Sequence, residues 1–171
     1  MTNKIIIGII TLFLTTTFFS CKEDTFEQLR KNELEKLRNY VETNYPEEQQ
    51  LPSGLYFLPT SEGSGDTIKV GDRVQIFYAT WTIDGNLVDE TDGYTKGHRY
   101  DPYEFVVGRG DAIQGLEEAM TYMRKGGKAD LIIPSEIAYG QSGNSRVPGF
   151  TTLLMQVEVY KIFPAPVQGA Q

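Results

Sequence analysis

The sequence predicts an α+β protein in which an antiparallel β-sheet wraps around one short helix, with a further helix at the N-terminus. Three observations lead to this prediction. Several short segments alternate apolar and polar residues between turns rich in Gly, Asp and Ser, which is the pattern of antiparallel strands. One internal segment, from Ile113 to Met123, has apolar residues at helical spacing, and a longer helical pattern covers residues 25–44. A single helix among antiparallel strands packs across one face of the sheet.

The strands are predicted from period-two alternation and from the turns between them. The longest, residues 73–83, ends at Asp84-Gly85, a dipeptide typical of a two-residue hairpin, and the return strand begins at Leu87-Val88. A polar loop, residues 91–101, follows this hairpin. The remaining strands are expected at residues 55–58, 103–107, 131–133 and 152–162.

The two helices have ends that the sequence marks. Asp111 is placed to cap the internal helix, and Gly126-Gly127 stops it. Pro46 ends the N-terminal helix, because proline disfavours helical geometry in the residue before it. The apolar stripe of the N-terminal helix leaves three arrangements open: packing on its own domain, acting as a stalk, or pairing with a second chain. We favour the first two.

Composition and charge exclude several classes of function. The formal net charge is -7 at pH 7 and no basic run occurs, whereas nucleic-acid binding needs a clustered basic surface. His98 is the only histidine and Cys21 the only cysteine. A metal site or a His-activated nucleophile needs companion residues that this sequence does not supply. We therefore expect no nucleic-acid partner, no metal and no cofactor.

The first twenty residues have the layout of a secretory signal. Lys4 precedes an apolar run of about 15 residues that ends at Ser20, which is short for a membrane span of roughly 20. Cys21 follows directly, where the lipidated cysteine of a lipoprotein stands. Lys22-Glu23-Asp24 resembles the charged signal that sends Bacteroidetes lipoproteins to the cell surface. We expect acylation of Cys21 and a lipid anchor in a membrane of the cell envelope, facing the periplasm or the cell surface. The other interpretation is an uncleaved anchor with an incidental cysteine.

A set of motifs runs in order through residues 53–163. They are Val74-Gln75-Ile76-Phe77-Tyr78 with Asp84-Gly85 and Val88-Asp89, Phe105-Val106-Val107-Gly108, Ala112-Ile113-Gln114-Gly115-Leu116-Glu117-Glu118, Met123-Arg124-Lys125-Gly126-Gly127, Pro134-Ser135-Glu136-Ile137-Ala138-Tyr139-Gly140, and Val147-Pro148 with the closing strand. Together they resemble the FKBP family of peptidyl-prolyl cis-trans isomerases. With the lipoprotein signal, the chain resembles the gliding-motility-associated isomerases of Bacteroidetes.

The resemblance implies an apolar substrate pocket between the sheet and its helix. It implies that the Ile113 backbone N–H and the Tyr139 hydroxyl donate hydrogen bonds to nearby carbonyls, while Asp89 orients the polar rim or the substrate backbone. The prolyl ring is expected to lie on Leu116, and the loop at 91–101 either contacts protein substrates or decorates the surface. The substrate-binding residues carried over by position are Tyr78, Val88, Tyr103, Phe105, Ala112, Leu116, Val147 and Met155.

The implied activity is rotation about Xaa-Pro bonds in proline-containing proteins of the cell envelope, which assists their folding. Val88, Leu116 and Met155 stand where the family pattern often has aromatic residues, so weaker inhibitor binding and modest activity on short peptides are expected. The alternative is a catalytically weak chaperone, or an accessory binding module of an envelope machine such as gliding motility.

The sequence leaves the oligomeric state open. It divides the chain into a signal peptide (1–20), a lipidated N-terminus and helical linker (21–50), an FKBP-type isomerase domain (51–163) and a C-terminal tail (164–171).

Overall fold

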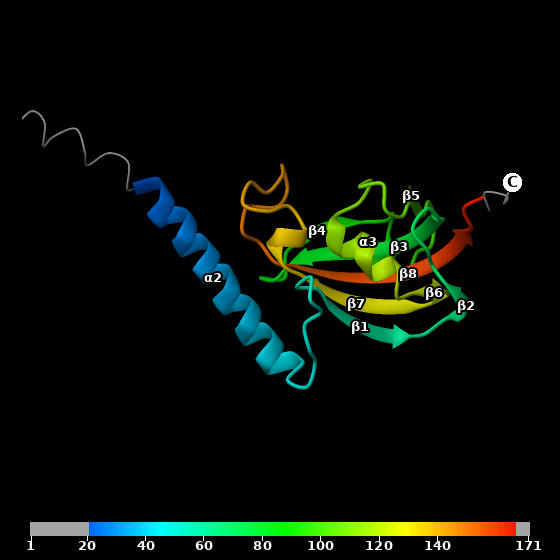
Figure 1. Ribbon diagram of the computed structural model, residues 1–171, viewed down its shortest axis with the longest axis horizontal. Coiled ribbons are helices and arrows are strands. Elements are labelled where there is room, and N and C mark those ends of the chain that lie inside the picture. Colours follow the sequence, from blue (N-terminus) through cyan, green and yellow to red (C-terminus); the bar gives the residue numbers. More distant parts are fainter. Residues whose placement is uncertain (1–20, 167–171) are drawn as a thin grey trace, which may run out of the picture.

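The computed structural model describes residues 21–166 (Figure 1). The predicted signal peptide, residues 1–20, lies outside the described residues, and so do residues 167–171 of the predicted tail. The described chain begins with helix α2 (Cys21–Asn44) and continues into a β-sheet domain whose last strand ends at Phe163. Neither this helix nor any other between residues 21 and 166 combines the length and the apolar character of a membrane span.

The main sheet contains six antiparallel strands, and a separate two-stranded ribbon lies beside it. The order across the main sheet is β1 (Tyr56–Ser61), β7 (Lys128–Ile133), β8 (Leu153–Phe163), β3 (Arg73–Thr82) and β4 (Leu87–Glu90), while β5 (Tyr103–Val106) also pairs with β3. The ribbon joins β2 (Ser64–Thr67) to β6 (Arg124–Lys125). Two 3-10 helices, η1 (Tyr94–Lys96) and η2 (Ser135–Ile137), lie in loops.

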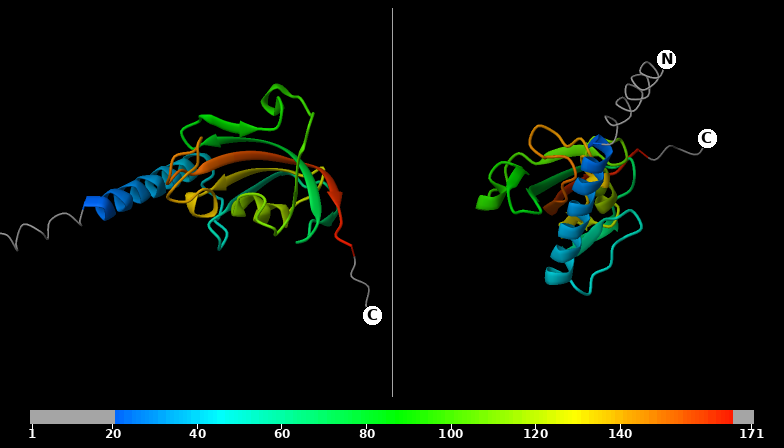
Figure 2. Two further views of the ribbon diagram at one scale, coloured as in Figure 1. Left: turned by 90° about the horizontal axis from the view of Figure 1, so that it is seen from above. Right: turned by 90° about the vertical axis from the view of Figure 1, so that its left-hand side faces the viewer.

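Strands β3 and β8 form the centre of the sheet, paired from Arg73 opposite Phe163 to Thr82 opposite Leu153. One face of β3 turns Val74 and Ile76 into the core, while Phe77 on the other face is also buried. The sheet curves around the short helix α3 (Gln114–Met120), as Figures 1 and 2 show. This arrangement confirms the predicted α+β fold.

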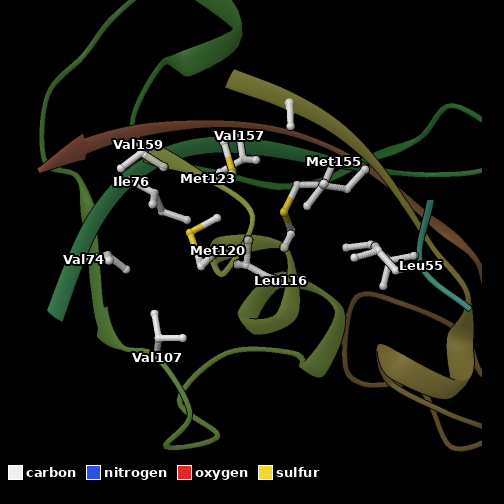
Figure 3. Close-up of a cluster of buried hydrophobic side chains, with 14 of the residues drawn as sticks. Leu55, Val74, Ile76, Val107, Leu116, Met120, Met123, Met155, Val157 and Val159 are labelled. Atoms are coloured by element: carbon white, nitrogen blue, oxygen red, sulfur yellow. The ribbon is translucent and has the colours of Figure 1, made fainter. Parts of the chain in front are cut away.

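The hydrophobic core fills the space between the inner face of the sheet and α3 (Figure 3). Leu116, Ala119 and Met120 of this helix are at most 3% exposed. Burying one large apolar side chain of this kind contributes about 1.5–3 kcal/mol. Gly115 lets the helix approach the sheet closely, since a Cβ atom there would lie 2.5 Å from Cγ2 of Ile133.

The structure corrects the predicted cap of α3. Asp111 is not the capping residue; the N-cap is Ile113, which has extended backbone angles and no capping side chain. No side chain caps the helix; the carboxylate of Glu117 in the first turn instead accepts the N–H groups of Gly108 (3.0 Å) and Ala112 (3.2 Å) and so holds the loop that leads into α3. Asp111 lies two residues before the N-cap, which is too early in the chain for the capping geometry.

The loop at 91–101 folds back over the outer face of the sheet. Arg99 donates to the carboxylate of Glu158 (3.0 Å), and its guanidinium lies 4.1 Å from the ring centre of Tyr94. The same guanidinium lies 5.9 Å from the ring centre of Phe77, which is only 2% exposed although it points away from the core. The loop therefore shields an aromatic side chain on the face opposite α3.

Helix α2 packs on the outside of the sheet through its C-terminal half (Figure 1). Leu37 and Val41 are buried and form a second apolar cluster with Leu58 of β1 and Ile132 of β7. The helix thus packs on its own domain, which is one of the arrangements that the sequence left open.

Candidate active site

A cavity of about 690 Å³ lies between α3, the inner face of the sheet and the chain after η2. Strand β3 supplies Tyr78 to its wall, α3 supplies Leu116, and β8 supplies Met155. Every residue that the sequence placed in the pocket lines this cavity, with the exception of Phe105. The predicted residues found there are Tyr78, Val88, Asp89, Tyr103, Ala112, Ile113, Leu116, Tyr139, Val147 and Met155.

Phe105 lies behind the cavity wall instead of in it. Its side chain is 3% exposed within the core, and its ring stacks on that of Tyr103 with 5.4 Å between ring centres. Tyr103 in turn meets Tyr78 edge to face at 5.9 Å, and its hydroxyl donates to the carbonyl of Asp111 (2.8 Å). Phe105 therefore supports the aromatic wall of the cavity, since such ring pairs contribute about 0.5–1.5 kcal/mol beyond burial.

Asp89 lies at the rim, where both of its carboxylate oxygens accept hydrogen bonds. The Tyr78 hydroxyl donates to Oδ2 (2.6 Å), and the Arg146 guanidinium donates to Oδ1 (3.0 Å). Burial of the ring, together with the hydrogen bond to Asp89, raises the pKa of Tyr78 well above its usual value near 10. Tyr78 therefore stays protonated at neutral pH and continues to donate to the carboxylate.

Tyr139 stands on the opposite side of the cavity, two residues after the end of η2. Burial is the main cause of the raised pKa of Tyr139, and the charge of Asp89 adds to it, while Asn144 and Arg146 act in the other direction. The side chain is nevertheless 38% exposed, so its hydroxyl is accessible from solvent. At neutral pH this group is a protonated hydroxyl that can donate to a bound carbonyl.

Ile113 presents a backbone donor at the start of α3. Its carbonyl accepts the N–H groups of Leu116 (3.0 Å) and Glu117 (3.1 Å), as expected of an N-cap residue. Its own N–H donates to no group within residues 21–166. A backbone N–H that is shielded from water requires an acceptor, and a carbonyl of a bound peptide can supply one.

The loop between Gly140 and Phe150 closes the cavity on the side of Tyr139. Asn144 organises this loop, because its side-chain oxygen accepts the N–H groups of Arg146 and Val147, both at 2.8 Å. Asn144 and Arg146 line the cavity, although the sequence analysis did not identify them. Gly143, Asn144 and Pro148 are residue types typical of turns, and they could have indicated a tight loop at this place in the sequence.

Thr80 is a further cavity residue that the sequence did not single out. It follows Tyr78 on the same face of β3 and is 4% exposed. Among the described residues, its hydroxyl oxygen is buried and has no hydrogen-bond partner in the protein. Buried polar atoms are nearly always hydrogen-bonded, so this hydroxyl is an exception among the described residues and adds no hydrogen bond to the fold.

The loop at 91–101 contributes nothing to the cavity lining. His98 lies in this loop, where its ring is 5.6 Å from that of Tyr100. In the part of the chain that the structure describes, no three His, Cys, Asp or Glu side chains come together as a metal site requires. The polar groups of the residues that line the cavity are thus two carboxylates (Asp89 and Asp111), two side-chain amides (Gln114 and Asn144), hydroxyls, a guanidinium and a backbone N–H.

The curved sheet, the helix it surrounds and the cavity between them define a domain of the FKBP type. Comparison with known families agrees: the FKBP-type peptidyl-prolyl cis-trans isomerase family matches residues 65–160. The chain belongs to this family.

Two relatives from Escherichia coli K12 extend the match beyond the family segment. The chain is 34% identical to the FKBP-type isomerase FkpA over 119 aligned residues. The alignment covers 70% of this chain and 42% of the relative. It is 36% identical to the FKBP-type 22 kDa isomerase over 126 aligned residues. This second alignment covers 72% of this chain and 58% of the relative. The chain thus spans about half the length of these relatives.

Solved structures share the fold. The crystal structure of Escherichia coli FkpA matches with a TM-score of 0.65 and 26% identity, covering 96% of this chain and 83% of the other. The peptidyl-prolyl cis-trans isomerase of Pseudomonas syringae matches with a TM-score of 0.68 and 24% identity, covering 81% and 96%. At 24% identity, the match to the Pseudomonas syringae protein supports a shared fold.

Proposed function

We propose that this protein is a peptidyl-prolyl cis-trans isomerase that catalyses rotation about Xaa-Pro bonds in cell-envelope proteins and so assists their folding. The observation that carries the proposal is the cavity. Apolar side chains such as Leu116 and Met155 form its deep part, and the backbone N–H of Ile113 at its edge has no acceptor within residues 21–166. Its volume of about 690 Å³ is in the range of small-ligand pockets.

Rotation about an Xaa-Pro bond is favoured by an apolar environment, and this cavity provides one. Resonance gives the Xaa-Pro bond a rotation barrier of about 18–20 kcal/mol. Twisting the bond breaks the resonance, and the twisted amide has less negative charge on its oxygen than the planar amide. Water stabilises the planar, more polar form, so an apolar cavity that replaces water lowers the cost of twisting. No covalent intermediate is needed.

The residues of the cavity take distinct parts in this proposal. Leu116, at 3% exposure, provides the apolar surface against which the prolyl ring lies. The Ile113 N–H and the Tyr139 hydroxyl donate to carbonyls on either side of the ring and hold the peptide while its bond rotates. Asp89 is held in place by Tyr78 and Arg146, and it orients the polar rim.

The activity is tested on the full-length chain in detergent micelles, with protease-free measurement of cis/trans exchange in an Xaa-Pro peptide by NMR. We expect the chain to accelerate the exchange, and Tyr139→Phe to lower kcat/KM by about 3- to 10-fold, the effect of one hydrogen bond. Tyr160→Phe is the matched control, because Tyr160 is an exposed tyrosine that does not line the cavity.

Exchange no faster than the uncatalysed rate would overturn the proposed enzyme. In that case the alternative is a binding module or chaperone that keeps the fold, and the absence of aromatic side chains at Val88, Leu116 and Met155 is the observation that favours it. Suppression of aggregation of an unfolded client by the same preparation would then support the alternative.

The proposal also includes the place of action. Lipidation of Cys21 is proposed from the signal-like residues before it, and helix α2 starts at this residue. An acylated Cys21 would keep the isomerase domain at a membrane of the cell envelope, facing either the periplasm or the cell surface. Proline-containing proteins that fold near this membrane are the proposed substrates.

A further inference from the structure

Glu33 occupies a buried position on α2 where helical spacing favours an apolar residue. It precedes Leu37 and Val41 by one and two steps of four residues, so the three share one face of the helix. Leu37 and Val41 pack on the sheet, and Glu33 is itself only 4% exposed. A buried carboxylate lowers stability unless hydrogen bonds compensate for the lost hydration.

Both carboxylate oxygens of Glu33 accept hydrogen bonds from the sheet domain. Oε1 accepts the backbone N–H of Ser135 (2.8 Å) and the hydroxyl of Thr152 (3.0 Å), and Oε2 accepts the hydroxyl of Ser135 (2.7 Å). Ser135 and Thr152 are also buried. The guanidinium of Arg30, one turn earlier on the helix, lies 3.9 Å from Oε2. The carboxylate therefore receives its three hydrogen bonds only while α2 is docked, since their donors all belong to the sheet domain.

Ser135 begins the turn that carries Tyr139 to the cavity. Its carbonyl accepts the N–H groups of Ala138 (3.0 Å) and Gly140 (2.7 Å), which closes the chain around Tyr139. Ala138 and Tyr139 both line the cavity. By holding Ser135 at its backbone and at its side chain, Glu33 fixes the origin of the turn that places the Tyr139 hydroxyl.

Two more contacts join α2 to the same side of the cavity, where the helix passes the loop after η2 (Figure 1). Arg30 forms an ion pair with Glu136 of η2. The ring of Phe26 lies 6.0 Å from that of Phe150, whose N–H donates to the carbonyl of Gly140 (3.0 Å). The helix therefore contacts both ends of the chain that forms this wall.

We propose that Glu33 is a positioning residue of the isomerase site, which fixes the orientation of the Tyr139 hydroxyl through Ser135. On this view the N-terminal helix is a functional part of the cavity wall as well as a connection. The inference rests on the proposed function, since it uses the role of Tyr139 as a donor to the bound peptide.

The primary test is Glu33→Gln in the full-length chain in detergent micelles. The amide keeps the size of the side chain but replaces one acceptor oxygen with an NH2 group, which cannot accept from Ser135 or Thr152. We expect kcat/KM to fall by about 3- to 10-fold, mainly in kcat, which is the loss expected of Tyr139→Phe, because Glu33 acts through that hydroxyl. A folded Glu33→Gln protein with wild-type kcat/KM would contradict the inference.

A double-mutant cycle separates positioning from a general loss of stability. If Glu33 acts through the Tyr139 hydroxyl, Glu33→Gln should change kcat/KM by less than about 2-fold once Tyr139→Phe is present, because coupled residues are non-additive. Losses that multiply would show that Glu33 acts independently of Tyr139, and the inference would fall. Glu35→Gln, at an exposed position of the same helix, is the control and should leave kcat/KM unchanged.

Ser135→Ala provides a second variant in case Glu33→Gln does not fold. It removes the hydroxyl donor while the backbone N–H still reaches Glu33, so a smaller loss of about 2- to 5-fold is expected, again absent beside Tyr139→Phe. If the wild-type chain shows no isomerase activity, the proposed function fails. The positioning role is then read from the Tyr139 amide and ring resonances in NMR spectra: a shift in Ser135→Ala supports it, and unchanged resonances reject it.

Discussion

The hydroxyl of Tyr78 donates to the carboxylate of Asp89 over 2.6 Å, and this bond joins two strands of the sheet at the rim of the cavity. Because Asp89 also accepts from Arg146, the same carboxylate connects the sheet to the loop on the far side. One partly buried hydroxyl and one rim carboxylate thus fix three separate segments of the cavity wall relative to one another.

Removal of this hydroxyl tests its structural contribution. We expect Tyr78→Phe to lower the free energy of unfolding by about 1 kcal/mol, because a hydrogen bond is lost and solvent hydrates the partly exposed Asp89 carboxylate in its place. Urea denaturation followed by circular dichroism measures the change. Tyr122→Phe is the comparison, since its hydroxyl makes only a long contact (3.4 Å) with Glu118; a loss as large there would argue against a special role for the Tyr78 hydroxyl.

The stability of the domain is expected to fall in alkaline solution. The pKa values of Tyr78 and Tyr139 are raised, mainly by burial, so these phenols keep their protons in the folded chain at a pH where the unfolded chain has begun to lose them. The full contribution is present below about pH 10, the unfolded value, and is lost as the pH rises from there toward the folded values.

Urea unfolding at pH 9, 10 and 11 measures this effect. Tyr78 contributes at most about 1.4 kcal/mol per pH unit to the loss, and Tyr139 contributes less, because its side chain is 38% exposed and solvent screens its charge. Tyr78→Phe should make the decline of the unfolding free energy with pH shallower, because it removes the tyrosine whose pKa is raised furthest. An equally steep decline in this variant would show that Tyr78 does not titrate as the structure implies.

The hydroxyl of Thr80 is expected to make no favourable contribution to the stability of the fold. Thr80→Val keeps the shape of the side chain and removes a hydroxyl that has no partner in the protein. We expect the free energy of unfolding, measured by urea denaturation, to be unchanged or higher, because no hydrogen bond is lost and a buried unpaired polar atom is removed. Thr151→Val is the control, because its hydroxyl lies outside the cavity lining and donates to the Gly149 carbonyl at 3.4 Å.

The lipid anchor is tested in cells by Cys21→Ser. In the wild-type chain we expect labelling with a fatty-acid analogue, globomycin-sensitive processing and partition with membranes. The serine variant should lose the label and accumulate as the unprocessed precursor. If the variant still matures and still partitions with membranes, the acyl group is not on Cys21.

The sequence predicted the main sheet well because burial on one face imposes a regular alternation. Val74 and Ile76 face the core, so β3 was found almost to its ends. Strands β2 and β6 were missed, since their residues are exposed and no alternation marks them. Their pairing depends on the close approach of Gly63 to Gly127, which is a contact between distant parts of the chain.

The pocket could be predicted from motifs, but the contacts that hold it in shape could not. Glu33 is a charged residue in a helix rich in Glu, Lys and Arg, and nothing local distinguishes it from an exposed glutamate. Its burial depends on Ser135 and Thr152, about a hundred residues further along the chain. Phe105 fitted the apolar pattern of the pocket as well as that of the core, and only the packing against Tyr103 decided between them.

The length of α2 sets a geometric limit on where the cavity can work. At about 1.5 Å of rise per residue, Cys21 lies about 18 Å along the helix axis from Glu33. If residue 21 were attached to a surface through a flexible linker, the distance between that surface and the domain could vary widely. If residue 21 is held at a membrane as proposed, a helix that continues without a break into the docking contacts permits only a short distance between that surface and the domain, so the cavity would reach only peptide segments lying close to it.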